Sequence, residues 1–405
     1  MGQTMGHAAA GGASGMDMKP KTTRPQLVAV TLLTVLALAG GTLLAALFGD
    51  LSMRPGNMQG MGNMGGLNGI VTPMNMNGLI MPPGMIMTAD MRPEALRDMA
   101  AVDPASATYT APPDARGDQP LQPRLDNGVK VFDLTTEIIR WNILPDRQVL
   151  AYAVNRQVPG PRIRVTEGDR VRMIVTNRLP DPTTIHWHGL TLPNGMDGAA
   201  DVTQAPIAPG ASFTYEFTIE QSGSYFYHSH TAPDRQQGLG LYGALIVDPK
   251  DPTTQPVADK EAVIQLQEWT VKAGYTFPAM PMEGAMPNFF TINGKAYPST
   301  ERITMRVGER LRVRFIGTNS GFIHPMHIHG GPFTIVATDG NPVPPSAQIQ
   351  KDTVNVGPGE RYDVIWTARQ PGKWLLHCHI NHHITNDNVE VDGGGGLTTI
   401  IEVTQ

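Results

Sequence analysis

The two halves of this 405-residue chain repeat one another, and this repeat constrains the fold more than any other feature. Three short motifs occur twice, in the same order: Gly168–Arg172 with Gly308–Arg312, His186–Gly189 with His327–Gly330, and His228–His230 with His377–His379. The offsets are 140, 141 and 149 residues. The offset changes only between motifs, where loop insertions cost little. The repeat predicts two copies of one domain, each of about 120 to 145 residues.

The texture of both halves is that of short β-strands. From about Gly128, runs rich in Val, Ile, Thr, Phe and Tyr alternate with Gly, Pro and Asn, as strands and their turns do. Examples are Val129–Ile138, Arg162–Thr166, Val171–Thr176 and Ser212–Ile219. Since no long amphipathic helical pattern occurs, we expect an all-β fold of two tandem Greek-key β-sandwiches. We place them at residues 121–250 and 251–405, with a Pro-rich link near Asp251–Ala258.

The N-terminal part has a different character. Leu27–Phe48 is an uncharged run of 22 residues, long enough to span a bilayer as a helix. Basic residues stand just before it: Lys19, Lys21 and Arg24. We therefore expect a cytoplasmic segment at 1–24, a transmembrane anchor at 25–49, and export of the rest to the periplasmic or extracellular side. A cleaved signal peptide is the alternative, but Phe48–Leu51 offers no Ala-x-Ala-like site.

Residues 50–120 form a linker rich in Met, Gly and Pro. Between Leu51 and Ala100 lie 11 of the 22 methionines, without apolar periodicity, so we expect a flexible tether rather than a fold. Thioethers are soft ligands that select Cu(I), and pairs such as Met61/Met64 could gather it. The alternative is a plain spacer in which Met simply recurs.

Charge and cysteine content exclude some classes of protein. With a formal net charge of -5 and a pI near 6.2, the chain has no basic stripe for a phosphate backbone, so we expect no nucleic-acid partner. The single cysteine, Cys378, rules out an intrachain disulfide and leaves the redox compartment open.

Histidines are grouped around this cysteine and in three other places. Four clusters take up 10 of the 12 histidines: His186/His188, His228/His230, His324/His327/His329 and His377/His379/His383. Residues i and i+2 of a strand point to the same face, so both imidazoles of a His-x-His pair can reach one site. A lone Cys is more often a buried, inert residue, but a thiolate beside several imidazoles is a ligand set suited to copper. The clusters together indicate a metal site.

On these motifs the chain resembles the multicopper oxidases from about Val129 to Gln405. The four histidine motifs stand in that family's order, and further segments match it: Pro159–Ile163, Gly168-Asp169, Asp197-Gly198, Thr203–Ile207 and Gly372–Trp374. Two domains instead of three make the chain similar to the two-domain laccases. The resemblance implies two cupredoxin-like sandwiches and about four copper ions per chain.

The resemblance also implies a role for each matching residue. A type 1 copper would be held by His324, Cys378 and His383. A type 2 copper would be held by His186 and His327, and a type 3 pair by His188, His228, His230, His329, His377 and His379. Asp197 would help to deliver protons near the type 2 copper; as a turn residue it has a simpler explanation.

Three further positions bear on the type 1 site, and one of them, Asn388, departs from the family. The first domain carries Ser229 where the second carries Cys378, so only the second should hold a type 1 copper; a copper nitrite reductase, with its cysteine in the first domain, fits less well. The usual axial position is Asn388: either its amide oxygen approaches the copper, or the loop Ile384–Gly396 is remodelled. His382 could exchange roles with its neighbour His383.

The resemblance implies a function and an assembly. We expect oxidation of a small reducing substrate, either phenols or metal ions such as Cu(I), coupled to reduction of O2 to water. A copper-binding or copper-resistance protein without turnover is the alternative. Because the trinuclear cluster takes histidines from both kinds of domain, and two-domain relatives form it between neighbouring chains, we expect a homotrimer.

Overall fold

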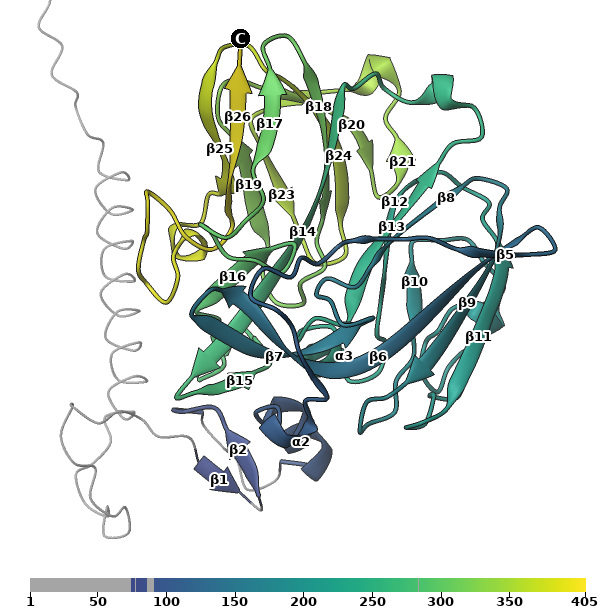
Figure 1. Ribbon diagram of the computed structural model, residues 1–405, viewed down its shortest axis with the longest axis vertical. Coiled ribbons are helices and arrows are strands. Elements are labelled where there is room, and N and C mark those ends of the chain that lie inside the picture. The colour runs from purple at the N-terminus through teal and green to yellow at the C-terminus, as the bar shows by residue number, and fades with distance from the viewer. Residues whose placement is uncertain (1–73, 77, 86–90, 283) are drawn as a thin grey trace, which may run out of the picture. The chain divides into compact units, whose positions relative to one another are not determined.

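The computed structural model describes residues 74–76, 78–85, 91–282 and 284–405 (Figure 1). The predicted cytoplasmic segment at 1–24 and the predicted anchor at 25–49 lie outside these ranges. Within the ranges, helices are short, and none has the length and apolar character needed to cross a membrane. Strands dominate, so the predicted all-β class is confirmed.

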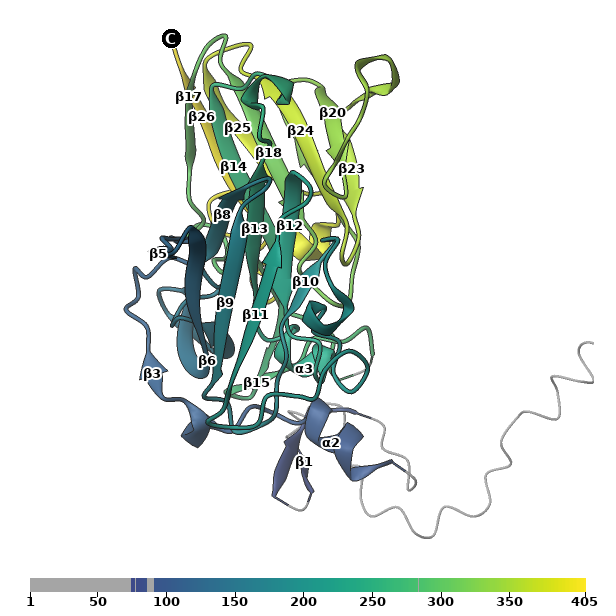
Figure 2. The same ribbon diagram turned by 90° about the vertical axis from the view of Figure 1, so that its right-hand side faces the viewer.

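The first β-sandwich consists of two sheets that enclose one core (Figure 2). One sheet has the order β10 (His186–His188), β12 (Gly223–His228), β13 (Tyr242–Asp248), β8 (Arg162–Thr166) and β4 (Pro120–Leu121). The other has the order β11 (Ser212–Thr218), β9 (Arg170–Asn177), β6 (Val129–Leu144) and β3 (Tyr109–Thr110), with β5 (Arg124–Asp126) and β7 (Arg147–Val154) also paired to β6. A short helix, α3 (Pro233–Gln236), lies between β12 and β13 in the chain.

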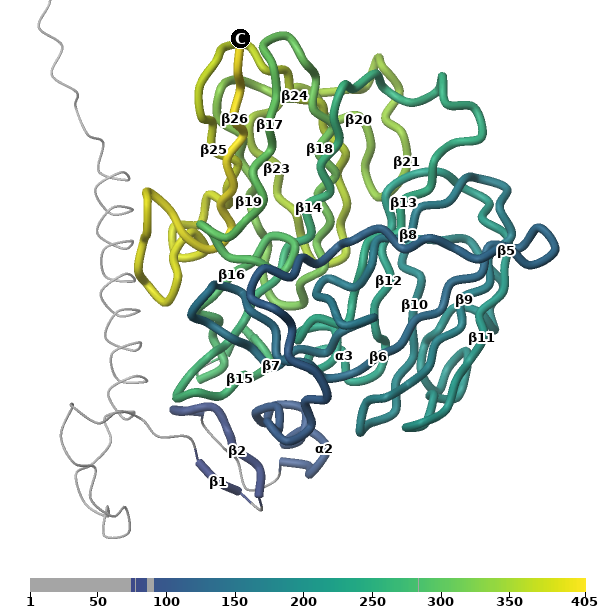
Figure 3. Tube along the Cα trace, in the orientation of Figure 1, coloured from purple at the N-terminus to yellow at the C-terminus, as the bar shows by residue number. Residues whose placement is uncertain are grey.

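The second sandwich is built in the same way. One sheet has the order β15 (Tyr275–Phe277), β14 (Lys260–Lys272), β18 (Arg310–Ile316), β24 (Arg361–Thr367), β20 (Phe333–Thr338) and β21 (Asn341–Pro342), with β16 (Phe289–Ile292) on β14 and β22 (Gln350–Lys351) on β20. The other has the order β17 (Ile303–Arg306), β26 (Thr398–Thr404), β25 (Gly372–Cys378), β19 (His324–Ile328) and β23 (Thr353–Val356). Figure 3 traces the chain through both sandwiches.

Strand pairing confirms the repeat seen in the sequence. In the first sandwich β6 runs parallel to β9, and in the second β14 runs parallel to β18. The histidine-bearing strands also correspond: β10 pairs antiparallel with β12, and β19 with β25. Alternating burial along β9 shows why the sequence folds this way, since every second side chain, such as Val171 and Met173, enters the core.

A partly buried ionic network joins the two sandwiches. Arg164 of β8 contacts Asp248 at 2.7 Å and Glu261 at 2.8 Å. Arg314 of β18 contacts Glu261 at 2.8 Å and Asp363 at 2.6 Å. Because Arg314 is almost fully buried, its two carboxylate partners offset a desolvation cost of several kcal/mol that an unpaired charge would carry.

The expectation of a flexible tether over residues 50–120 is wrong for the part that the structure describes. Strands β1 (Met74–Met76) and β2 (Leu79–Met81) form a hairpin, and helix α2 (Pro93–Met99) follows. Further on, β3 and β4 join the first sandwich. The methionines of this segment show no helical or strand periodicity, but they can still form a core, because the flexible side chain of methionine fills irregular gaps.

These methionines form a separate small core. Its buried members are Met81, Met85, Met99, Ala100, Met280 and Ala285, and Met76, Met91 and Met282 pack against them. A backbone hydrogen bond ties this segment to the second sandwich: Val102 N donates to Thr276 O at 3.0 Å. We call this group of seven methionines the methionine cluster.

Candidate metal centre

One cysteine and two histidines converge in the interior of the second sandwich. His324 begins β19, Cys378 ends β25, and His383 lies in the 3-10 helix η5 (Asn381–Ile384). Cys378 Sγ lies 3.6 Å from His383 Nδ1 and 3.9 Å from His324 Nδ1, and the two Nδ1 atoms are 3.1 Å apart. All three side chains are buried. One thiolate with two imidazoles is the donor set of a blue-copper site, so these residues fit copper.

The local fold explains why His324 meets Cys378 and His383, which follow it by 54 and 59 residues in the sequence. Met326 pairs directly with Cys378 across β19 and β25, which places His324, two residues before Met326, on the same face of its strand. The turn of η5 then brings His383 back over the thiol. Burial raises the pKa of the Cys378 thiol to about 12 and lowers that of His383 to about 3. A metal ion would therefore have to displace the thiol proton.

A carboxylate that we did not predict completes this buried site. Glu268 Oε1 lies 3.1 Å from His324 Nε2 and also accepts hydrogen bonds from Asn319 Nδ2 and Phe322 N. With Nε2–H donating to the carboxylate, Nδ1 of His324 is left free for a metal, as outer partners of metal-bound histidines commonly arrange. The only signal in the sequence is an acidic residue within the otherwise buried strand β14.

Asn388 and His382 differ from the three buried residues in their surroundings. Asn388 is exposed, in a turn closed by the bridge between Asn386 and Val389, whereas the three ligands are buried. His382 Nε2 lies 3.2 Å from the carbonyl oxygen of Pro287, whereas Nδ1 of His383 faces Cys378.

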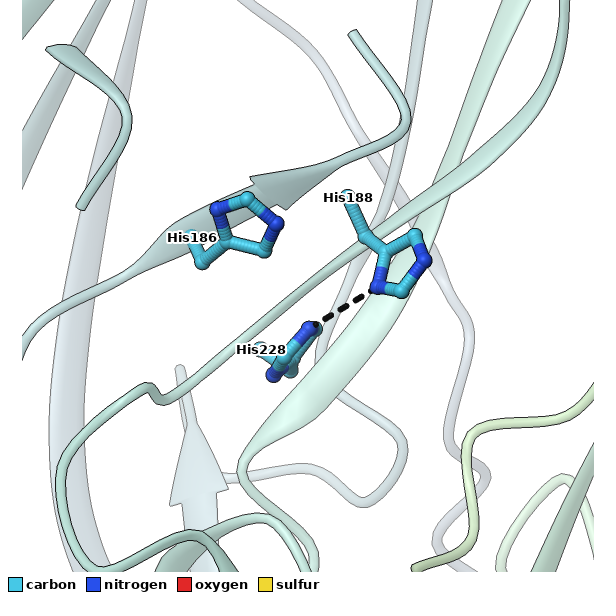
Figure 4. Close-up of side chains that lie close together, drawn as sticks. All are labelled: His186, His188 and His228. Atoms are coloured by element: carbon cyan, nitrogen blue, oxygen red, sulfur yellow. Dashed lines mark hydrogen bonds between the residues drawn. The ribbon is translucent and has the colours of Figure 1, made fainter. Parts of the chain in front are cut away.

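A second group lies in the first sandwich. His186, His188 and His228 bring their ring nitrogens together (Figure 4). Direct register of β10 on β12 places His186 opposite His228, and His188 Nδ1 lies 3.2 Å from His228 Nε2. The ring of His230 is 5.6 Å from that of His186, centroid to centroid. The structure thus gathers all four histidines predicted for this sandwich.

Asp197 adjoins this group through its backbone. Its carbonyl oxygen accepts a hydrogen bond from His186 Nδ1 at 2.7 Å, while its carboxylate lies 3.6 Å from the same nitrogen. The peptide therefore sets the orientation of His186 and leaves Nε2 for a metal. Burial is the main cause that lowers the pKa of His188 and His228 to about 3, so both are neutral at physiological pH.

A third group in the second sandwich mirrors the second. It consists of His327, His329 and His377, and His329 Nε2 lies 3.0 Å from His377 Nε2. His327 Nδ1 donates to the carbonyl of Asp352 at 2.7 Å, as His186 does to Asp197. The ring of His379 lies 5.7 Å from that of His327. Cys378 stands between His377 and His379, so the chain itself joins the buried site to this group.

Among the described residues these remain three separate groups, and none combines histidines from both sandwiches. Imidazole binds copper and several other transition metals, and the thiolate of Cys378 beside two imidazoles favours copper among them.

Comparisons with known proteins agree with this donor set. Residues 136–252 and 276–389 each match a family model described as multicopper oxidase. The blue copper oxidase of Nitrosomonas europaea is 37% identical, with a TM-score of 0.62, over 68% of this chain and 86% of that one.

Two curated relatives are matched over less of their length. The multicopper oxidase MmcO of Mycobacterium tuberculosis is 34% identical over 52% of this chain and 46% of its own. Copper resistance protein A of Pseudomonas syringae pv. tomato is 30% identical over 58% and 45%. The chain therefore spans about half the length of the curated relatives it matches.

Replacing Glu268 should weaken the buried site without unfolding it. Glu268→Gln keeps the shape but removes the charge that orients His324 and holds its Nε2 proton. We expect the affinity for copper at this site to fall about 10-fold to 100-fold, measured by competition with a chelator. Glu301→Gln, an exposed residue of the same type, is the control, and equal affinities in both variants would contradict the assigned role.

Acid should destabilise the metal-free protein through its buried histidines. His228 has a pKa of about 3 when folded and about 6.5 when unfolded. Between these values the unfolded chain binds the extra proton, so the free energy of unfolding falls as pH drops from about 6.5 toward 3.

The His228→Asn variant isolates this effect, because it removes the group that titrates. We expect its urea-unfolding free energy to depend less steeply on pH than that of the unmodified protein, by up to about 1.4 kcal/mol per pH unit. Parallel curves for the two proteins between pH 6.5 and 4 would show that His228 is not held neutral by the fold.

Proposed function

This chain belongs to the multicopper oxidase family, and from that premise we propose that it oxidises a small reducing substrate and passes the electrons to O2. The observation that supports this most directly is the buried triad of His324, Cys378 and His383. Cys378 is flanked in the chain by His377 of the third group and by His379, whose ring lies near that group. Copper bound at these residues supplies one-electron oxidation at the triad and four-electron reduction of O2 to water at a trinuclear cluster.

We assign the residues as follows. His324, Cys378 and His383 hold the type 1 copper, and Glu268 fixes the tautomer of His324. His186 and His327 hold the type 2 copper, each oriented by a backbone carbonyl. The type 3 pair is held by His188, His228, His230, His329, His377 and His379. Asp197, with its carboxylate beside His186, is placed to transfer protons to the reduced oxygen, and these sites make about four coppers per chain.

The trinuclear cluster forms between chains in this proposal. The two all-histidine groups lie in different sandwiches and form separate groups within one chain. Each has the three or four imidazoles of half a cluster, so a neighbouring chain must supply the other half. A head-to-tail contact between different surfaces closes into a ring, and a homotrimer is the assembly that we propose.

Cu(I) is the substrate favoured by the methionine cluster. Thioethers select Cu(I), and the loop that carries Met280 borders the buried site: Ala279 and Pro281 are the neighbours that a side chain at Gly321 would meet, together with Glu268 Oε2. Electrons from an ion held at the cluster would have a short route to His324 through Glu268. Phenols are the second candidate substrate. We also propose that residues 25–49 form a membrane anchor, which would place the sandwiches outside the cytoplasm.

Copper content and colour test the oxidase proposal. Purified full-length protein should bind about four coppers per chain and show an intense visible thiolate-to-copper band, because Cys378 is its only thiol. Cys378→Ser and His383→Gln should abolish the band, whereas His382→Gln should keep it.

The same preparation tests the assembly and the rival functions. Sedimentation should give a trimer, and a monomer with its full copper complement would contradict the shared cluster. Full copper loading without O2 consumption with any donor would favour a binding protein. Nitric oxide released from nitrite would indicate a nitrite reductase.

Methionine replacement separates the two substrates. Met280→Leu conserves volume but removes a thioether, so we expect KM for Cu(I) to rise several-fold while phenol oxidation stays unchanged. Initial rates of O2 consumption with each donor measure this. Met74→Leu, at an exposed position, is the control; equal losses for Cu(I) and phenol in Met280→Leu would argue against a Cu(I) site.

A further inference from the structure

Two neighbouring arginines of β18 lie between the sandwiches and have very different partners. Arg312 and Arg314 alternate with Leu311 and Val313, which enter the core of the second sandwich, so both arginines face the first sandwich. Each is at least 95% buried. Arg314 is fully engaged, because it contacts Glu261, Asp363 and the Ser224 hydroxyl.

Arg312 lacks such a carboxylate. Among the described residues its guanidinium contacts only neutral acceptors: Nη1 donates to Gln255 Oε1 at 2.5 Å, and Nη2 donates to the carbonyl of Pro256 at 3.0 Å. Its Nε–H finds no acceptor there. An arginine stays charged in proteins, and a buried charge without an opposite charge in contact is costly. Burial and then the adjacent Arg314 lower the pKa of Arg312, and the charges of Asp363 and Glu261 offset this only in part.

A cavity adjoins this arginine. It has a volume of about 100 Å³ and is bordered by the charged residues Arg312, Arg314 and Asp363 and by apolar residues, among them Val247, Val336 and Pro342. A water molecule occupies about 30 Å³ of liquid, so the cavity has room for a molecule of several heavy atoms. Walls of this kind suit a ligand with one charged end and one apolar end.

We propose that this cavity is a binding site for a small monocarboxylate, with Arg312 as its recognition residue. The planar guanidinium matches a carboxylate in geometry and charge, and Nη1 and Nη2, which each make one hydrogen bond, each keep a second N–H for a carboxylate oxygen. The short aliphatic part would lie against Val247 and Val336. Residues from both sandwiches border the site, so the bound acid would stabilise their contact. The site is independent of the copper sites and of the proposed oxidase function.

Thermal unfolding with propionate as the probe tests this site. The full-length protein is titrated with sodium propionate at constant ionic strength set with sodium chloride, and in parallel with propionamide, which has the same shape without the charge. We expect the unfolding midpoint to rise with the logarithm of propionate concentration and to stay constant with propionamide. An equal rise with both, or no rise with propionate, would overturn the proposal.

Variants tie the response to the cavity. Arg312→Met should abolish the propionate-dependent rise, whereas Arg306→Met, the same change at an exposed position on β17, should keep it. Ala337→Leu, on strand β20 of the same sheet, fills the cavity with Arg312 intact and should also abolish the rise, which covers the case in which Arg312→Met does not fold. A response that survives in Ala337→Leu would place propionate elsewhere and refute the site.

Discussion

The burial of one thiol against two imidazoles is the constraint on which the candidate centre depends. Cys378, His324 and His383 come from a strand end, a strand start and a one-turn helix, and they meet only because β19 pairs with β25 in one register. A shift of one residue would turn Cys378 to the opposite face of its strand. The surrounding core, with Met326 and Leu376 fully buried, prevents that shift because it would expose those apolar side chains.

The same register also links this site to the neighbouring histidines. Residues on either side of Cys378 point away from it, as alternation along a strand requires, and so His377 belongs to the third group and His379 lies beside it. A carbonyl or carboxylate fixes the ring of several histidines: Asp197 and Asp352 act through their peptides on His186 and His327, and Glu268 acts through its side chain on His324. Ligand orientation is thus set mainly by backbone, which substitution disturbs least.

The interface between the sandwiches has an apolar part, where Phe226 and Ile246 pack with Val263 and Ile316, and an ionic part. Arg164 and Arg314 are shared among three carboxylates, and Arg312 stands beside this network with neutral partners only. In the same region Gly223 begins β12, the strand that ends in His228. Interactions that stabilise this interface therefore also stabilise β12, one of the strands that carry the candidate metal-binding histidines.

Sequence alone determined the all-β class, the repeat, and the identity of the histidines that come together, because strand alternation and His-x-His spacing are local properties that a sequence displays. It did not reveal that Glu268 contacts His324, that Arg312 lacks a carboxylate, or that Met81 and Met280 share a small core. Nor could it show that Asn388 is exposed while the triad is buried. Those contacts join residues far apart in the chain, and only the packing of strands and loops in three dimensions decides which side chains meet and which remain without a partner.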